Sequence, residues 1–120
     1  MDYANITELN LSSKGLTKLL DLSNYTNLKK LDCSNNEITH LDNLSLSIRY
    51  LDCSYNKITH LDNLPLSLIT LICSYNKITS LDNLPKTLLY LDCSWNKITS
   101  LDHLPLSITE LYCSFTPLHI

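Results

Sequence analysis

The sequence of 120 residues contains a single glycine, Gly15, and this scarcity excludes one kind of site and disfavours another. A phosphate-binding loop needs several glycines at fixed spacing, because its backbone must wrap closely around the phosphate. A calcium-binding β-roll needs glycine-rich turns in every repeat. The sequence therefore excludes a phosphate-cradling loop and argues against calcium binding.

Basic clusters and long apolar runs are also missing. The chain has nine Lys and Arg and twelve Asp and Glu, which gives a net charge of −3, and the basic residues are scattered along the sequence. This charge disfavours nucleic acid or an anionic membrane as the main partner. No apolar run approaches the length of a membrane span, and the first residues do not resemble a signal peptide. The sequence thus predicts a soluble chain with no nucleic-acid or membrane partner.

What the sequence does contain is one 20-residue unit that repeats along nearly its whole length. The unit LDCSYNKITHLDNLPLSLIT starts at Leu51, and the units from Leu71 and Leu91 follow the same pattern. Such a repeat indicates one small unit stacked many times. We expect a single domain over residues 1–120, with a lead-in at 1–8, repeats that start at 9, 31, 51, 71 and 91, and a partial terminal repeat over 111–120. The first unit is longer, and its extra residues are expected to close one helical turn.

Each unit opens with Leu-x-Cys or Leu-x-Leu, an alternation typical of a half-buried strand. A buried asparagine amide that follows can satisfy the backbone groups that a turn leaves free. The outer segment is too short for an α-helix with turns on both sides, and its prolines favour extended geometry. We therefore expect an α/β-type solenoid with a parallel β-sheet on the concave face and a mostly extended or 3-10 convex face with little α-helix. The expected asparagine ladder is Asn36, Asn56, Asn76 and Asn96.

All five cysteines occupy one register of the unit, where the first repeat has Leu11. This exchange indicates that the thiol serves as a small hydrophobic group. A straight column of thiols cannot surround a zinc ion tetrahedrally, so buried free thiols are favoured over a metal site, and a redox liability is a second alternative. Free thiols in this number imply a reducing compartment such as the cytoplasm. The predicted core cysteines are Cys33, Cys53, Cys73, Cys93 and Cys113.

The segment LKKLDCSNNEI, which starts at Leu28, matches the pattern L-x-x-L-x-L-x-x-N-x-L. The pattern recurs from Ile48, Leu68 and Leu88 and begins again at Ile108. Over about residues 6–118 the chain thus resembles leucine-rich repeat proteins. Its short unit with Leu-Pro is similar to repeats of bacterial effectors, and the Cys-Ser-x-Asn version is similar to repeats of amoebal and large DNA virus proteins. The resemblance implies a non-catalytic, intracellular protein-binding module without a cofactor; it does not imply the ubiquitin-ligase domain that such effectors often carry.

Aromatic residues gather in the column that precedes the ladder asparagines and at outward strand positions, and they define the candidate binding surface. The column runs Asn35, Tyr55, Tyr75, Trp95 and Phe115. Tyr and Trp are favoured where one surface recognises another, although stacked aromatics can also merely brace neighbouring strands. An acidic row of Asp32, Asp52 and Asp92 on the same face either favours a basic ligand or is a solvated strand face. The predicted partner-binding residues are Tyr50, Asp52, Tyr55, Tyr75, Tyr90, Asp92, Trp95, Tyr112 and Phe115.

Three further polar columns receive structural interpretations. Asp and Asn side chains at the turn into the convex face commonly bond their own backbone. Lysines of the repeat are expected to offset the charge of these aspartates. His40 above His60 would bind a metal ion only adventitiously. A serine recurs in every unit without a histidine to activate it, so we expect no enzyme. The columns are Asp42, Asp62, Asp82 and Asp102; Asn43, Asn63 and Asn83; and Lys57, Lys77 and Lys97.

The last unit is expected to be the weak point of the stack. Seven residues follow Cys113, and no polar capping helix is visible among them. The last strand is therefore expected to present an open edge that Pro117 blunts only in part. A second copy of the chain would cover this edge. The alternative function is accordingly a structural protein that self-associates, as a homodimer, through its uncapped C-terminal end.

Overall fold

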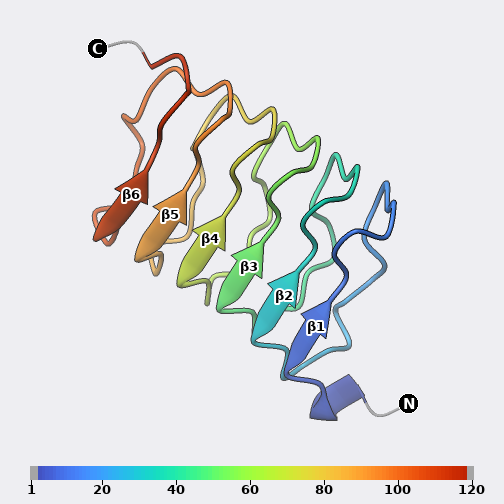
Figure 1. The fold of residues 1–120 in the computed structure, drawn as a ribbon. Helices are drawn as coiled ribbons and strands as arrows, with labels where there is room; N and C mark the ends of the chain where they lie inside the picture. The colour runs from blue at the N-terminus through green and yellow to red at the C-terminus, as the bar shows by residue number, and fades with distance from the viewer. Residues whose placement is uncertain (1–2, 119–120) are drawn as a thin grey trace.

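The computed structural model describes residues 3–118, and its elements follow the repeat closely. The predicted lead-in and partial terminal repeat each include two residues outside this described part. After a short 3-10 helix, η1 (Tyr3–Asn5), each unit contributes one three-residue strand to a single parallel sheet in chain order (Figure 1). The strands are β1 (Glu8–Asn10), β2 (Lys30–Asp32), β3 (Tyr50–Asp52), β4 (Thr70–Ile72), β5 (Tyr90–Asp92) and β6 (Glu110–Tyr112).

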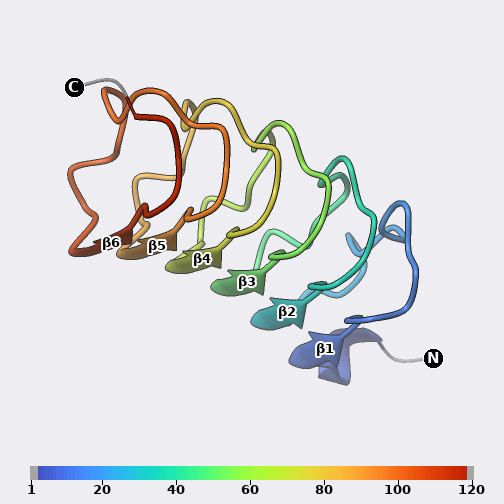
Figure 2. The ribbon, with the colours of Figure 1, turned by 45° about the horizontal axis from the view of Figure 1, so that its top comes forward.

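The leucine at the centre of each strand sets the register of the sheet. Leu31 pairs with Leu51 and Leu51 with Leu71, and all three side chains are fully buried. The layers stack into an open coil of 50 × 30 × 18 Å, in which each strand contacts only its neighbours (Figure 2). The predicted parallel-sheet solenoid is thus confirmed.

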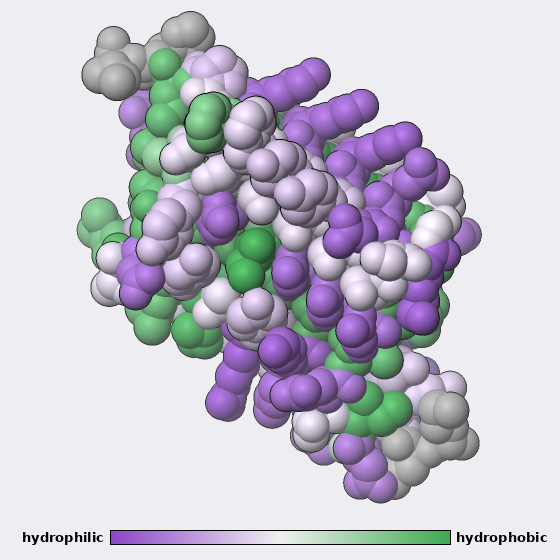
Figure 3. All heavy atoms as spheres, viewed as in Figure 1, coloured by the Kyte–Doolittle hydropathy of each residue, from purple (hydrophilic) through white to green (hydrophobic). Residues whose placement is uncertain are grey.

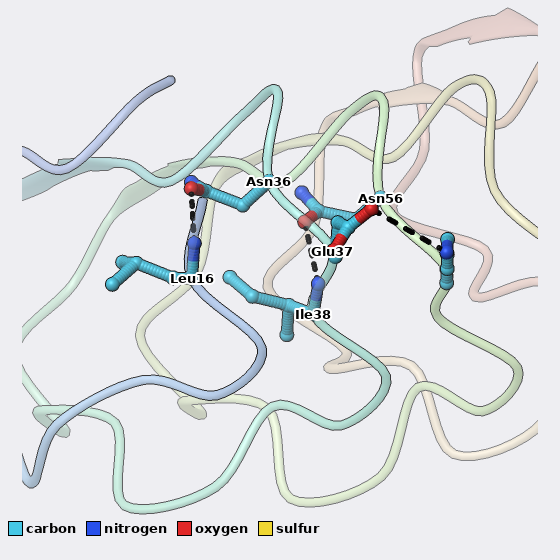
Figure 4. Close-up of polar contacts among 6 residues, drawn as sticks. Leu16, Asn36, Glu37, Ile38 and Asn56 are labelled. Atoms are coloured by element: carbon cyan, nitrogen blue, oxygen red, sulfur yellow. Dashed lines mark hydrogen bonds and ion pairs between the residues drawn. The ribbon is translucent and has the colours of Figure 1, made fainter. Parts of the chain in front are cut away.

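The asparagine of each unit is the hydrogen-bonding centre of the turn after the strand. The amide Nδ2 of Asn56 donates to the carbonyl oxygens of Cys33, Cys53 and Ser54 at 3.0, 3.0 and 3.2 Å. Its Oδ1 accepts from the backbone N–H of Ile38 at 3.0 Å (Figure 4). One buried side chain therefore serves backbone groups of two adjacent layers. Equivalent bonds are made by Asn36, Asn76 and Asn96.

The convex side is built from turns, which confirms the prediction of little α-helix. The N–H of Leu68 donates to the carbonyl oxygen of Pro65 at 3.2 Å, and the same turn recurs one layer on. A hydroxyl then joins adjacent layers: Ser67 Oγ lies 2.7 Å from the carbonyl oxygens of both Leu46 and Ile48. Hydroxyls at this position in the units before and after bond in the same way, so these carbonyl groups find partners without a helix, whereas the hydroxyl of Ser107 in the last unit is buried without a hydrogen-bond partner among the described residues.

The expected helical turn in the longer first unit is wrong. The N–H of Tyr25 donates to Leu22, and the N–H of Leu28 donates to Tyr25, so two separate turns follow one another. The ring of Tyr25 is buried at this point and lies 4.7 Å from the ring of Tyr3. The additional residues thus serve to bury an aromatic ring beside the first layer.

Replacing Asn56 with alanine is expected to lower the free energy of unfolding by about 3 kcal/mol or more, since several buried backbone groups lose their partner. Asn24 is exposed, and Asn24→Ala is the matched control, with an expected change below about 0.5 kcal/mol. Urea unfolding followed by circular dichroism measures both variants. Indistinguishable midpoints for the two would contradict the role of the ladder.

Candidate functional site

The backbone enters the left-handed region two residues after the Leu-x-Cys or Leu-x-Leu segment of each unit. The residue before each ladder asparagine has φ between 55° and 58°, first at Asn35 and then at three aromatic residues. Asparagine tolerates this conformation, whereas for most other L-residues the left-handed backbone costs about 1–2 kcal/mol of folding free energy. The aromatic side chains therefore occupy a position for which the backbone favours asparagine.

Four of these aromatic side chains form one continuous stack, which we call the aromatic ladder: Tyr55, Tyr75, Trp95 and Phe115. Ring centroids of successive members lie 4.3, 5.2 and 4.1 Å apart, with interplanar angles of 9°, 14° and 13°. A stacked pair contributes about 0.5–1.5 kcal/mol beyond the apolar area that it buries, which offsets the cost of the left-handed backbone. Stacking therefore stabilises the rings at this position although the backbone favours asparagine.

The aromatic ladder remains open to solvent along one side. The exposed fractions of Tyr55, Tyr75 and Trp95 are 49%, 39% and 44%, and that of Phe115 is 70%. The faces of the inner rings contact each other, so the exposed parts are mainly ring edges. Three of the rings line a shallow groove of about 550 Å³ together with Asn35 and three of the ladder asparagines, Asn36, Asn56 and Asn76. Figure 3 shows this side as a pale row of side chains between two hydrophilic rows.

The structure separates the remaining predicted aromatic residues from the ladder. Tyr90 and Tyr112 lie side by side with centroids 5.5 Å apart, and Tyr50 contacts the ammonium group of Lys30, whose Nζ lies 4.9 Å from the ring centroid. Thr70 occupies the strand position between Tyr50 and Tyr90. Desolvation, followed by the carboxylates of Asp52 and Asp32, raises the pKa of the Tyr50 hydroxyl. The predicted site is thus spread over three columns of one sheet face: the aromatic ladder, the column of Tyr50 and Tyr90, and the acidic row, which Tyr112 continues.

The acidic row is half-buried and partly engaged in its own turns. Oδ1 of Asp52 accepts hydrogen bonds from the N–H and the hydroxyl of Ser54 at 3.0 and 2.6 Å. Asp32 makes the same pair of bonds with Ser34, and Asp92 accepts from the N–H of Ser94. These carboxylates therefore fix the turn after the strand while they contribute negative charge to the face.

The other polar columns differ in part from their interpretation. Within residues 3–118, Lys57 pairs with Glu37 at 3.6 Å and no lysine has a turn aspartate within 4.0 Å, so the expected offset of lysines against these aspartates is wrong. His103 Nε2 lies 3.9 Å from Oδ1 of Asp82. His40 Nδ1 lies 2.8 Å from the hydroxyl of the preceding Thr39. Across the described residues, no three His, Cys, Asp or Glu side chains are grouped as a metal site would require.

The cysteines form a single column beneath the sheet. Cys33, Cys53, Cys73 and Cys93 are fully buried, and Cys113 is half-buried in the last layer. Burial raises the pKa of the Cys33 and Cys93 thiols from the ordinary value of 9.0 to about 12, with smaller effects of nearby carboxylates on Cys33 and of Cys113 and then Asp92 on Cys93. All five are free thiols.

One exposed apolar row was not anticipated from the sequence. Leu46, Leu66 and Leu106 project from the convex side with exposed fractions of 79%, 78% and 104%. In the sequence they alternate with buried leucines, as in Leu64-Pro65-Leu66, and so resemble core positions. The available signal was Lys86, which occupies the same position of the unit and shows that it faces solvent.

Comparisons with known proteins agree with the fold. A family model described as Leucine Rich Repeat matches residues 27–47. The leucine-rich repeat domain of a Shigella effector superposes on 93% of the chain with a TM-score of 0.85 and 31% identity. YopM from Yersinia enterocolitica matches 78% of the chain with a TM-score of 0.72 and 42% identity.

A third similar structure is the functional domain of InlJ from Listeria monocytogenes, which includes a cysteine ladder. It matches 98% of the chain with a TM-score of 0.59 and 32% identity. The chain spans 50% of the Shigella effector domain, 21% of YopM and 36% of the InlJ domain. A comparison with curated protein sequences gives no match. Over residues 3–118, the chain forms no helix with the length and hydrophobicity of a membrane span.

The buried thiols predict a pH dependence of stability. In the folded chain they keep protons that unfolded thiols lose above about pH 9, so the free energy of unfolding is expected to fall between about pH 9 and about pH 12. Replacing Cys33 and Cys93 with alanine removes two of these groups and should flatten the decline. Denaturant unfolding at several pH values measures the difference, and identical slopes for both chains would refute it.

Proposed function

Because the chain is a solenoid of leucine-rich repeats similar to those of bacterial effectors, we propose that it is a protein-binding module whose concave sheet face recognises a partner protein. Leucine-rich repeat domains are typical protein-interaction modules and are generally non-catalytic scaffolds. The proposal assigns recognition to the aromatic ladder and the acidic row beside it. Tyr50, Tyr90 and Tyr112 widen the contact.

The observation that carries this proposal is the half-exposed aromatic ladder. Its rings stand at positions where asparagine would suit the backbone better, and their stacking offsets that disadvantage. Stacking does not require the ring edges to stay open to solvent, and these open edges give a partner an apolar surface to contact. Tyr and Trp supply large contact area with few rotatable bonds, so they are favoured at the centres of interfaces.

Other features of the same face support a protein partner. Asp52 and Asp92 flank Ile72, so the row beside the ladder alternates between charge and an apolar side chain. Tyr90 and Tyr112 add a further apolar area at the C-terminal part of the sheet. The five free thiols suit a reducing compartment, which supports the cytoplasm as the place where the partner is met.

A paired pull-down from the lysate of the native host tests the proposal. The variant Tyr55→Asn, Tyr75→Asn, Trp95→Asn removes three rings but keeps the residue type that position 35 uses in the same backbone conformation. We expect it to stay folded and to lose a protein that the unchanged chain retains.

The matched control replaces the same number of exposed apolar side chains on the convex side: Leu46→Asn, Leu66→Asn and Leu106→Asn. It should retain the partner. Equal retention by the ladder variant and the unchanged chain would overturn the assignment of the sheet face. Circular dichroism of each bait confirms that its fold is intact before the comparison.

Self-association is the second candidate function, and the last layer of the described chain favours it. Leu111 and Cys113 are half-buried, whereas the equivalent Leu71 and Cys73 are fully buried. A second copy of the chain against β6 would cover this apolar layer. Light scattering of the 120-residue chain is expected to show a mass that rises with concentration. A constant monomer mass would eliminate this function.

A further inference from the structure

A column of lysines runs beside the aromatic ladder, and it consists of Lys57, Lys77 and Lys97. Each follows its ladder ring by two residues and is exposed. The backbone N–H of each lysine donates to an isoleucine carbonyl one layer back, at 2.8–2.9 Å, so the column keeps the register of the sheet. In Figure 3, long hydrophilic side chains project on one flank of the pale row.

The lysine column is largely unneutralised. Within the described part of the chain, Lys57 is paired with Glu37, and neither Lys77 nor Lys97 has a carboxylate within 4.0 Å. Three like charges one strand spacing apart, about 4.8 Å, create a locally positive strip. The chain as a whole has a charge of −3, so the strip does not follow from its general composition. It attracts a partner that carries negative charge at this flank.

We propose that the partner presents an amphipathic, acidic α-helix that lies along the solenoid axis, with its apolar stripe on the aromatic ladder and its carboxylates at the lysine column. This inference rests on the proposed function, because it names the partner element for the same face. The acidic row of Asp32, Asp52 and Asp92 lies beyond the other side of the ladder and repels carboxylates there. The helix is therefore acidic on one flank only.

The spacing of the layers favours a helix over an extended peptide. Layers repeat about every 4.8 Å, a helix rises about 5.4 Å per turn, and same-side residues of an extended strand lie about 6.6 Å apart. Over the three steps of the ladder, a helix drifts out of register by roughly 2 Å and a strand by more than one layer. A helix of about 10–12 residues thus places one apolar and one acidic side chain opposite each layer.

The same geometry disfavours single-stranded nucleic acid as the occupant. Bases bind aromatic side chains through open ring faces. In the ladder, neighbouring rings cover each other's faces at 4.1–5.2 Å. The acidic row would also repel phosphate groups. Ring edges and lysines together suit apolar and carboxylate side chains.

Selection from a phage library of helical peptides of about 16 residues, with the 120-residue chain as bait, tests this inference. The enriched peptides are expected to be net acidic, with an apolar stripe and acidic residues on one flank. Their affinity is then measured for the charge variant Lys57→Glu, Lys77→Glu, Lys97→Glu. The matched control is Lys18→Glu, Lys29→Glu, Lys86→Glu, which changes the net charge equally at other positions of the repeat.

We expect the column variant to weaken binding at least about tenfold and the control less than about twofold. Exchange of the acidic flank of a peptide for lysines should restore its binding to the column variant. A proline at the centre of the peptide should abolish binding, because it breaks the helix. Each variant is first checked for cooperative unfolding.

The inference is overturned if no peptide is enriched, if the enriched peptides are neutral or basic, if the column variant binds normally, or if the central proline has no effect. In each of these cases, the ladder variant with three asparagines distinguishes failure of this inference from failure of the proposed function. Loss of the native partner by that variant leaves the proposed function standing while the acidic helix is rejected. Retention of the partner rejects the sheet face itself.

Discussion

The buried asparagine amide is the interaction on which the rest of this molecule depends. Each one bonds to carbonyl oxygens of its own layer and of the layer before, and accepts an N–H that no strand partner reaches. Leaving any of these buried groups unpaired would cost about 1–3 kcal/mol. The amide therefore fixes both the turn and the distance to the next turn. The stacked rings, the thiol column and the lysine column all take their spacing from it.

The fold was largely predictable because the same residue types recur at the same positions of every unit. Leu51 and Cys53 alternate as buried strand residues, and Asn56 marks the turn, so strand position and stacking follow from the 20-residue spacing. The convex side was less predictable. Leu66 and Leu68 share an alternation with Leu64, yet the turn that starts at Pro65 points Leu66 to solvent. Periodicity describes regular backbone and does not indicate such a rotation.

The sequence indicated which residues form the candidate site, but it indicated less well how their side chains contact each other. Residues 20 positions apart stack, so one column containing Tyr55 and Tyr75 was foreseeable. Tyr50 and Lys30 are likewise 20 positions apart and in contact, whereas Tyr112 contacts Tyr90 across two different strand positions, which spacing alone does not indicate. The left-handed backbone at Tyr55 had one sequence clue, the asparagine at position 35. The lysines were assigned to the wrong carboxylates, because the repeat does not reveal which columns lie within reach of each other.

A solenoid whose layers contact only their neighbours can change its length without changing its shape. Insertion of one more 20-residue unit would add one strand, one amide, one ring and one lysine, each already in register with its neighbours. In-frame duplication or loss of a gene segment would thus lengthen or shorten the recognition surface by one fixed step. In this architecture the length of the surface that contacts a partner can change while each individual contact stays the same.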